Sequence, residues 1–110
     1  MKGFQLQFYM DQNKRHRHLA LWEWFIEAAH SHGIRGATAF MGESGYGHQG
    51  RIHSAHLFEL GDQPAEVTMI VTEEESEKMF SLLKAENIYA FFVKIPVEFG
   101  TLGDSMSSPP

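Results

Sequence analysis

The sequence predicts an α+β sandwich in which two helices cover one face of a four-stranded antiparallel sheet. Two observations predict it: the elements follow the order β-α-β-β-α-β, and 110 residues suffice for one domain with a modest core. Two helices cannot cover both faces of such a sheet, so we expect the other face to stay open, as in ferredoxin-like folds. We expect the domain to span residues 1–100. Residues 101–110, rich in Ser, Gly and Pro, are expected to form a disordered tail.

Hydrophobic spacing defines the elements of the first half. Residues 4–10 alternate apolar and polar side chains, which predicts a half-buried strand. A helical face follows, made by Leu19, Trp22, Phe25, Ile26 and Ala29. Gly33 is placed to end this helix, and residues 34–41 are predicted to form the second strand.

The second half repeats the pattern after Pro64, which marks the entry to a strand with Val67, Met69 and Val71 on one side. Thr72 and Glu75 have the spacing of a capping box, which predicts a helix start. We expect that helix to end near Glu86. A last strand follows, in which the alternating residues are Tyr89, Phe91, Val93 and Ile95.

The open face of the sheet is expected to be partly apolar. The side chains assigned to it are Gln5, Gln7, Tyr9, Thr38, Phe40, Thr68, Ile70, Phe92 and Lys94. A monomer rarely exposes a patch such as the one that Phe40, Ile70 and Phe92 would form. The pattern therefore predicts self-association.

Composition excludes several classes of function. A formal net charge of −5 argues against nucleic acid, whose binding relies on Lys and Arg. The absence of cysteine removes disulfides, thiolate chemistry and Cys-ligated zinc, and it is typical of a cytoplasmic protein. No apolar run approaches the length of a membrane span, so we expect no membrane insertion. Lys2 leads directly into strand-like residues, so we expect no signal peptide.

The stretch from Gly33 to Gly50 is the best candidate for a functional segment because it holds six glycines in eighteen residues. Its later part opens a long connection, Gly42 to Gln63, in which Ile52 to Leu60 could form a further extended segment. No Gly-Lys-Ser/Thr follows, so it is not a P-loop. Glycines leave backbone N–H groups accessible, and such groups can bind an anion. A plain flexible connection between strands is the alternative.

Three sequence blocks here carry a family resemblance: GIRGATAFMG, GYGHQG and RIHSAHLFEL, followed by Pro64 and a strand. They resemble the PII-like proteins grouped as domain of unknown function 190, relatives of the PII nitrogen signal transducers. The resemblance implies a homotrimer with ligand clefts between subunits and an adenine nucleotide as candidate effector. It places Thr38 on the strand entering the site and Gly47, His48 and Gln49 on the turn.

The candidate ligand-binding residues are therefore Arg35, Thr38, Gly47, His48, Gln49 and Arg51. His48 stands where PII proteins commonly have arginine, so a phosphate contact would depend on its protonation. The lysine-bearing loop that PII proteins have before the last strand is missing, and residues 98–104 hold no Lys or Arg. A ligand less charged than ATP, or AMP, is therefore easier to accommodate.

The resulting hypothesis is a PII-like regulatory protein whose Gly42 to Gln63 loop is read by a transporter or an enzyme. Two alternatives stay open. Seven histidines could serve a divalent-metal-binding trimer of the same fold, because imidazole suits zinc, copper and nickel. The chain could also be a ligand-free oligomeric interaction module. We expect no enzyme, since His53 and His56 flank Ser54 in sequence without the geometry of a nucleophile and base.

Overall fold

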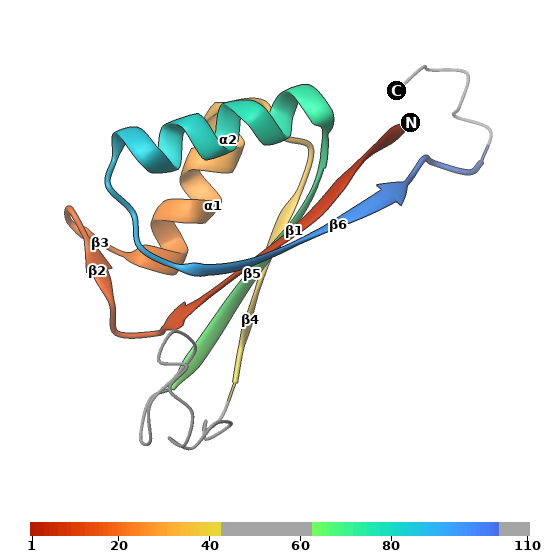
Figure 1. The fold of residues 1–110 in the computed structure, drawn as a ribbon. Coiled ribbons are helices and arrows are strands. Elements are labelled where there is room, and N and C mark those ends of the chain that lie inside the picture. Colours follow the sequence, from red (N-terminus) through yellow and green to blue (C-terminus); the bar gives the residue numbers. More distant parts are fainter. Residues whose placement is uncertain (43–62, 104–110) are drawn as a thin grey trace.

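The computed structural model describes residues 1–42 and 63–103, and it confirms the ferredoxin-like α+β arrangement with one addition. Four strands form a sheet in the order β4-β5-β1-β6, and each neighbouring pair is antiparallel (Figure 1). The addition is a small hairpin, β2–β3, placed before the first helix. The elements are β1 (Lys2–Asp11), β2 (Arg15–His16), β3 (Leu19–Ala20), α1 (Leu21–Ser31), β4 (Ala37–Met41), β5 (Pro64–Thr72), α2 (Glu73–Ala85) and β6 (Phe91–Glu98).

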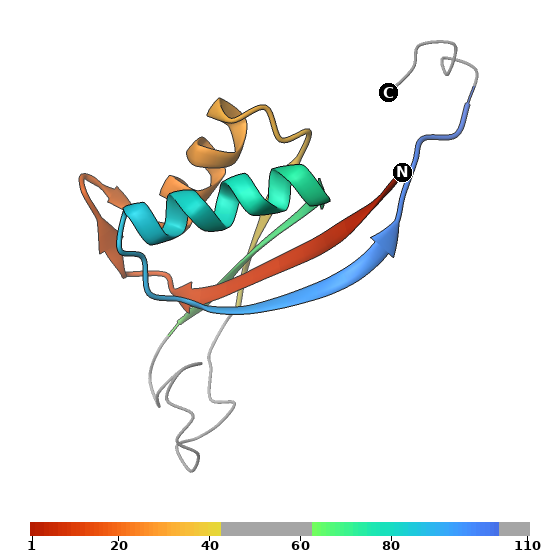
Figure 2. The ribbon, with the colours of Figure 1, turned by 45° about the horizontal axis from the view of Figure 1, so that its top comes forward.

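Both helices pack against the same face of the sheet, and Figure 2 shows the two helices above the strands. The core between them is built from every second residue of the central strands β1 and β5 and from the inner faces of the helices. Phe8 of β1 stacks on Phe25 of α1 with ring centroids 4.6 Å apart. Burial of each large side chain of this kind contributes about 1.5–3 kcal/mol to folding. The largest fully buried side chains are Phe8, Phe25, Leu6, Leu21, Met69, Met79, Val67 and Val71.

The start of α2 and the end of α1 follow signals in the sequence. Thr72 caps α2 as predicted: its Oγ1 accepts a hydrogen bond from Glu75 N at 3.1 Å, while Glu75 Oε1 accepts one from Thr72 N at 2.9 Å. At the end of α1, Gly33 has a φ of +76°. There Ile34 N donates to Ala29 O at 3.0 Å, the 6→1 bond of a Schellman cap. Satisfied terminal groups therefore fix where α2 begins and where α1 ends.

Two predicted boundaries are wrong for a local reason. The helical face was expected to start at Leu19, but Leu19 pairs with His16 in the hairpin and α1 begins at Leu21. The second strand was expected from residue 34, but Ile34 is buried as part of the helix cap and β4 begins at Ala37. The predicted extended segment Ile52 to Leu60 and residues 104–110 of the predicted tail lie outside the described residues.

The prediction of which residues lie on the open face is confirmed for β1, β4 and β5 and is wrong for β6. Directly paired residues of an antiparallel sheet lie on the same face. Phe92 and Lys94 pair with Phe8 and Leu6, which face the helices, so the prediction that they lie on the open face is wrong. Phe92 instead lies 5.0 Å from Phe80 of α2 between ring centroids. The residues of β6 on the open face are Phe91, Val93 and Ile95, paired with Tyr9, Gln7 and Gln5.

The β2–β3 hairpin is held by one carboxylate of α2. Glu86, the C-cap of that helix, accepts hydrogen bonds from Arg17 Nε and Nη2, both at 3.0 Å, and its Oε1 lies 2.9 Å from His16 Nε2. Arg17 has a φ of 60°, a left-handed conformation that is unfavourable for a residue with a side chain. His16 also contacts Trp24 of α1 edge-on, with centroids 5.1 Å apart. His16 therefore contacts both α1 and the end of α2.

This contact predicts a pH dependence of stability. Hydrogen bonds from His16 and then from Arg17 favour the ionised carboxylate, so the pKa of Glu86 lies below its ordinary value of 4.5. Because the folded-state pKa is lowered, the contact stabilises the fold at neutral pH. Its contribution is lost as the pH falls below 4.5 and through the folded-state pKa.

We expect Glu86→Gln to lower stability at neutral pH and to reduce the loss of stability on acidification. Urea unfolding measured from neutral to acidic pH checks this, with Glu77→Gln on an exposed position of α2 as the matched control. Equal pH slopes for Glu86→Gln and the natural protein would show that the hairpin contact contributes nothing.

Candidate functional site at the base of the glycine-rich segment

The two stems that flank residues 43–62 are tied together at one point. Gly42 N donates to Pro64 O at 2.8 Å, which joins the end of β4 to the start of β5. The side chain of Gln12, just after β1, donates through Nε2 to Gly42 O at 3.1 Å and to Pro64 O at 3.2 Å. Gln12 N also donates to Gln63 O at 2.7 Å. We call this arrangement the Gln12 clamp.

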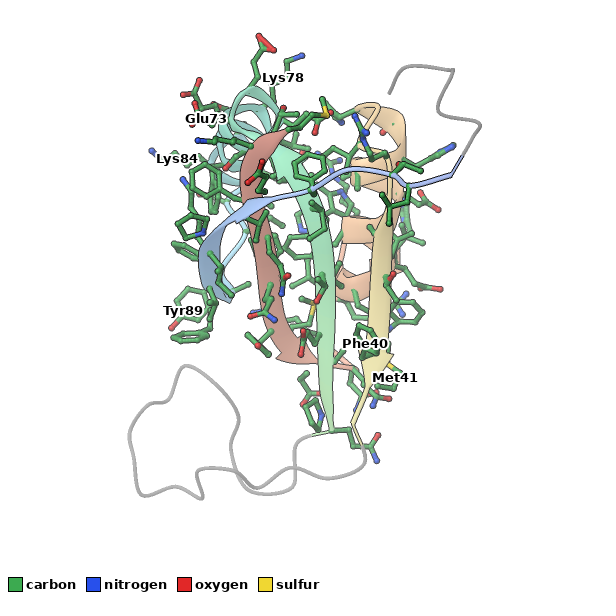
Figure 3. All side chains as sticks on the ribbon, turned by 90° about the vertical axis from the view of Figure 1, so that its right-hand side faces the viewer. Phe40, Met41, Glu73, Lys78, Lys84 and Tyr89 are labelled. Atoms are coloured by element: carbon green, nitrogen blue, oxygen red, sulfur yellow. The ribbon has the colours of Figure 1, made fainter. Side chains whose placement is uncertain are left out.

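A hollow of about 260 Å³ lies beside the Gln12 clamp, on the open face of the sheet. Three of its side chains form one row across the strands, because Glu66 of β5 pairs with Phe40 of β4 on one side and with Tyr9 of β1 on the other. Figure 3 shows Phe40 and Met41 at the end of β4 that leads to residue 43. The lining residues are Tyr9, Phe40, Met41, Gly42, Pro64, Ala65 and Glu66.

The hollow has an acidic side that is organised by hydrogen bonds. Glu66 Oε2 accepts from Thr68 Oγ1 at 2.7 Å and from Gln7 Nε2 at 3.4 Å. Tyr9 Oη donates to Gln7 Oε1 at 3.4 Å. Burial raises the pKa of Tyr9, and the negative charge of Glu66 raises it further. The network therefore fixes the carboxylate of Glu66 and keeps the Tyr9 phenol neutral.

The structure places two of the six candidate ligand-binding residues. Thr38 lies on the open face and pairs with Thr68, one row away from Glu66 and Phe40. Arg35 precedes β4 at the end far from the hollow, where its guanidinium lies 5.6 Å from the ring centroid of Phe99 and donates to Met1 Sδ at 3.7 Å. A strand rises about 3.3 Å per residue, so Arg35 and Gly42 are separated by most of the sheet. The other four candidates, Gly47, His48, Gln49 and Arg51, lie outside the described residues.

Sequence reasoning missed the Gln12 clamp and the role of Glu66. Gln12 contacts residues 30 and 52 positions away in sequence, and no local pattern reports such a contact. Glu66 is the one charged residue of β5, at a position that the alternation of the strand assigns to the open face. That signal alone could have marked it as a candidate.

A larger hollow of about 580 Å³ lies on the other side of the molecule, between α1 and α2. Trp24 and Leu82 line it, as do His30, His32 and Glu86. His32 Nδ1 lies 2.9 Å from Ala28 O, and Glu86 is already bound by Arg17 and His16. Within residues 1–42 and 63–103, no three His, Asp or Glu side chains are grouped so that they could hold a metal ion. The loop base is therefore the better candidate site.

Comparisons with known proteins agree with the fold. The crystal structure of a Thermus thermophilus protein that carries the name PII-like signaling protein matches with a TM-score of 0.55 and 17% identity, over 88% of this chain and 90% of that one. The apo form of CPII from Thiomonas intermedia K12, a nitrogen regulatory PII-like protein, matches with a TM-score of 0.54 and 11% identity, over 89% of this chain and 96% of that one. In the part of the chain that the structure describes, neither helix is long and apolar enough to cross a membrane.

The sequence itself matches a family model. The model of DUF190, described as an uncharacterized ACR family, covers residues 3–92, which include both helices and the strands that flank the glycine-rich segment. The resemblance seen in the sequence blocks is therefore confirmed, and the chain belongs to the DUF190 family of PII-like fold.

Proposed function

We propose that this protein is a PII-like regulator in which a small molecule, bound at the loop base in a cleft between subunits, controls the Gly42 to Gln63 loop. The observation that carries the proposal is the Gln12 clamp beside the hollow. Both stems of the segment meet there, so a ligand in the hollow touches Met41 and Gly42 on one stem and Pro64 on the other. A ligand with different affinity for two arrangements of the stems shifts the balance between them.

The open sheet face supports the subunit cleft. Phe40 is 55% exposed, and Phe91 and Ile95 are each 38% exposed on the same face. An apolar surface of this kind favours association with further copies. In a homotrimer, as the family resemblance implies, the hollow at the edge of that face becomes a cleft between neighbouring subunits.

The remaining parts of the proposal concern the ligand and the partner. Of the two candidate residues that the structure describes, Thr38 lies nearer to the hollow, one row away in the sheet. The contacts with the ligand are proposed to be completed by Gly47, His48, Gln49 and Arg51. Arg35 is proposed to act from a neighbouring subunit, because it lies at the other end of β4 in its own chain. An adenine nucleotide is the candidate effector, a transporter or an enzyme is the proposed partner of the Gly42 to Gln63 loop, and the protein is proposed to be cytoplasmic.

The experiment is a thermal-shift screen of ATP, ADP, AMP, cyclic AMP and bicarbonate. A ligand that binds the native state selectively raises its melting temperature. We expect at least one effector to raise it, and to change hydrogen exchange at the Gly42 amide, which bonds to Pro64 O. A screen in which no compound shifts either quantity would favour the ligand-free interaction module.

Gln12→Ala tests the clamp directly. The substitution removes two side-chain hydrogen bonds, which together stabilise the closed stems by about 1 kcal/mol, since Gln12 is only partly buried. We expect the Gly42 amide to exchange about fivefold faster. Asn13→Ala, one residue further on, is the control and should leave that rate unchanged. Unaltered exchange in Gln12→Ala would show that the clamp does not hold the stems.

A further inference from the structure

The described side chains around the hollow have the wrong charge for a phosphate. Among the seven described residues that line it, Glu66 carries the one formal charge and none is Lys, Arg or His. Two negative groups close together in a site of low dielectric repel each other strongly. The described part of the site therefore disfavours the polyphosphate of ATP and favours a positive charge.

Two aromatic rings flank this carboxylate. Phe40 and Tyr9 are the direct cross-strand partners of Glu66, one on each side, so their Cβ atoms lie about 4.5–5.5 Å from its own. Aromatic faces attract cations through the ring quadrupole, and cages of this type recognise quaternary ammonium groups. In the single chain Phe40 is 55% exposed, so its ring is open to the proposed cleft between subunits.

The carboxylate has a spare acceptor. The hydrogen bonds from Thr68 and Gln7 both reach Oε2 of Glu66, and Oε1 accepts none from the described residues. A carboxylate can accept about four hydrogen bonds, so Oε1 can still receive an N–H donor or face a positive charge. Thr68 and Gln7 hold Glu66 in position between the two rings while Oε1 stays available.

We propose that this hollow binds the ammonium or guanidinium group of a small organic cation, between Phe40 and Tyr9 and against Oε1 of Glu66. The proposal rests on the proposed function in placing a small molecule at the loop base, and in this hollow it replaces the adenine nucleotide with an organic cation. A volume of about 260 Å³ is below the usual range for whole ligands, so the hollow holds the charged head and leaves the rest of the molecule outside. The same chemistry can come from a free compound or from a Lys or Arg side chain of another copy of the chain.

Choline chloride is the probe, and its binding to the full chain is followed by calorimetry and by NMR shifts of the Phe40 and Tyr9 rings. We expect Glu66→Gln, which keeps the shape and removes the charge, to weaken choline binding about tenfold or more. Phe40→Leu should weaken it about fivefold through loss of the ring face. Glu98→Gln, at the other end of the sheet, is the matched control and should bind choline as the natural protein does.

The size of the assembly, measured by light scattering in the same titration, distinguishes the two sources of the cation. A free ligand is indicated when choline binds and the assembly is unchanged by choline and by Glu66→Gln. A neighbouring side chain is indicated when Glu66→Gln weakens the assembly and choline competes with it. The proposal is overturned when choline fails to bind and Glu66→Gln leaves the assembly intact, or when Glu66→Gln binds choline as well as the natural protein. If an adenine nucleotide still shifts stability in that case, the regulatory function stands and only the cation site fails.

Discussion

An alanine at position 3 is expected to lower the free energy of unfolding by at least about 2 kcal/mol, because it forces side-chain atoms into packed backbone. Gly3 is buried in β1, where it pairs with Thr72 at the junction of β5 and α2. A Cβ at this position would lie 1.9 Å from Val71 O and 2.9 Å from Thr72 Cα. Backbone atoms cannot rotate away as the end of a side chain can, so β1 and β5 would have to separate.

Two other glycines make matched controls for Gly3→Ala. A Cβ at Gly36 meets nothing within 4 Å, so Gly36→Ala should leave stability unchanged or raise it slightly. Gly33 also has open space but a φ of +76°, so Gly33→Ala should cost about 1 kcal/mol through its conformation alone. The stability of all three variants is measured by urea unfolding and by melting temperature, at one fixed protein concentration. For Gly3→Ala we expect the melting temperature to fall by about 8 °C or more. A Gly3→Ala protein as stable as Gly36→Ala would show that the strands separate at little cost.

The fold was predictable because its signals are local and agree with each other. Thr72 and Glu75 lie three residues apart and cap α2 through each other, so the helix start needs no distant contact. Gly33 ends α1 through its own conformation. In β1 and β5, apolar and polar residues alternate, and the burial of the strands follows this alternation. Such consistency between local and global structure makes a fold readable from its sequence.

The last strand was misassigned because both of its faces are apolar. Phe91 and Phe92 are adjacent and equally hydrophobic, so alternation cannot say which faces the helices. β6 is also an edge strand, and Phe92 stays 47% exposed although it lies on the helix side. Only the register with β1, which pairs Phe8 with Phe92, settles the assignment.

The missed features depend on contacts between residues far apart in sequence. The β2–β3 hairpin is too short and polar to be predicted, and it is held by Glu86, about 70 positions away. The candidate site also depends on distant contacts. Alternation within the strand placed Thr38 correctly on the open face. The Gln12 clamp could not be predicted in this way, because it forms only where the sheet order brings β1 beside β5 and β5 beside β4.

The substitution Ile95→Asp is expected to dissociate the proposed assembly. Ile95 lies on the open face of β6, pairs with Gln5 and is 38% exposed in the single chain. In an interface over this face, the substitution would place an unpaired carboxylate in an apolar surface, at a cost of about 3 kcal/mol or more. That cost weakens association on the order of a hundredfold. Light scattering and sedimentation should give a multiple of 12.5 kDa for the natural protein and 12.5 kDa for Ile95→Asp at micromolar concentration.

Two further substitutions connect the expected dissociation to one face of the sheet. Leu102 is 95% exposed and lies beyond β6, so Leu102→Asp should leave the assembly intact. Phe92 is on the helix side, 5.0 Å from Phe80 and 6.5 Å from Phe8 between ring centroids, so Phe92→Asp should lower the free energy of unfolding. A natural protein that runs at 12.5 kDa at micromolar concentration would remove the subunit cleft, and with it the proposed means by which a ligand controls the loop. An Ile95→Asp protein that is monomeric but still unfolds cooperatively would place the interface on the open face, because Ile95 lies on that face.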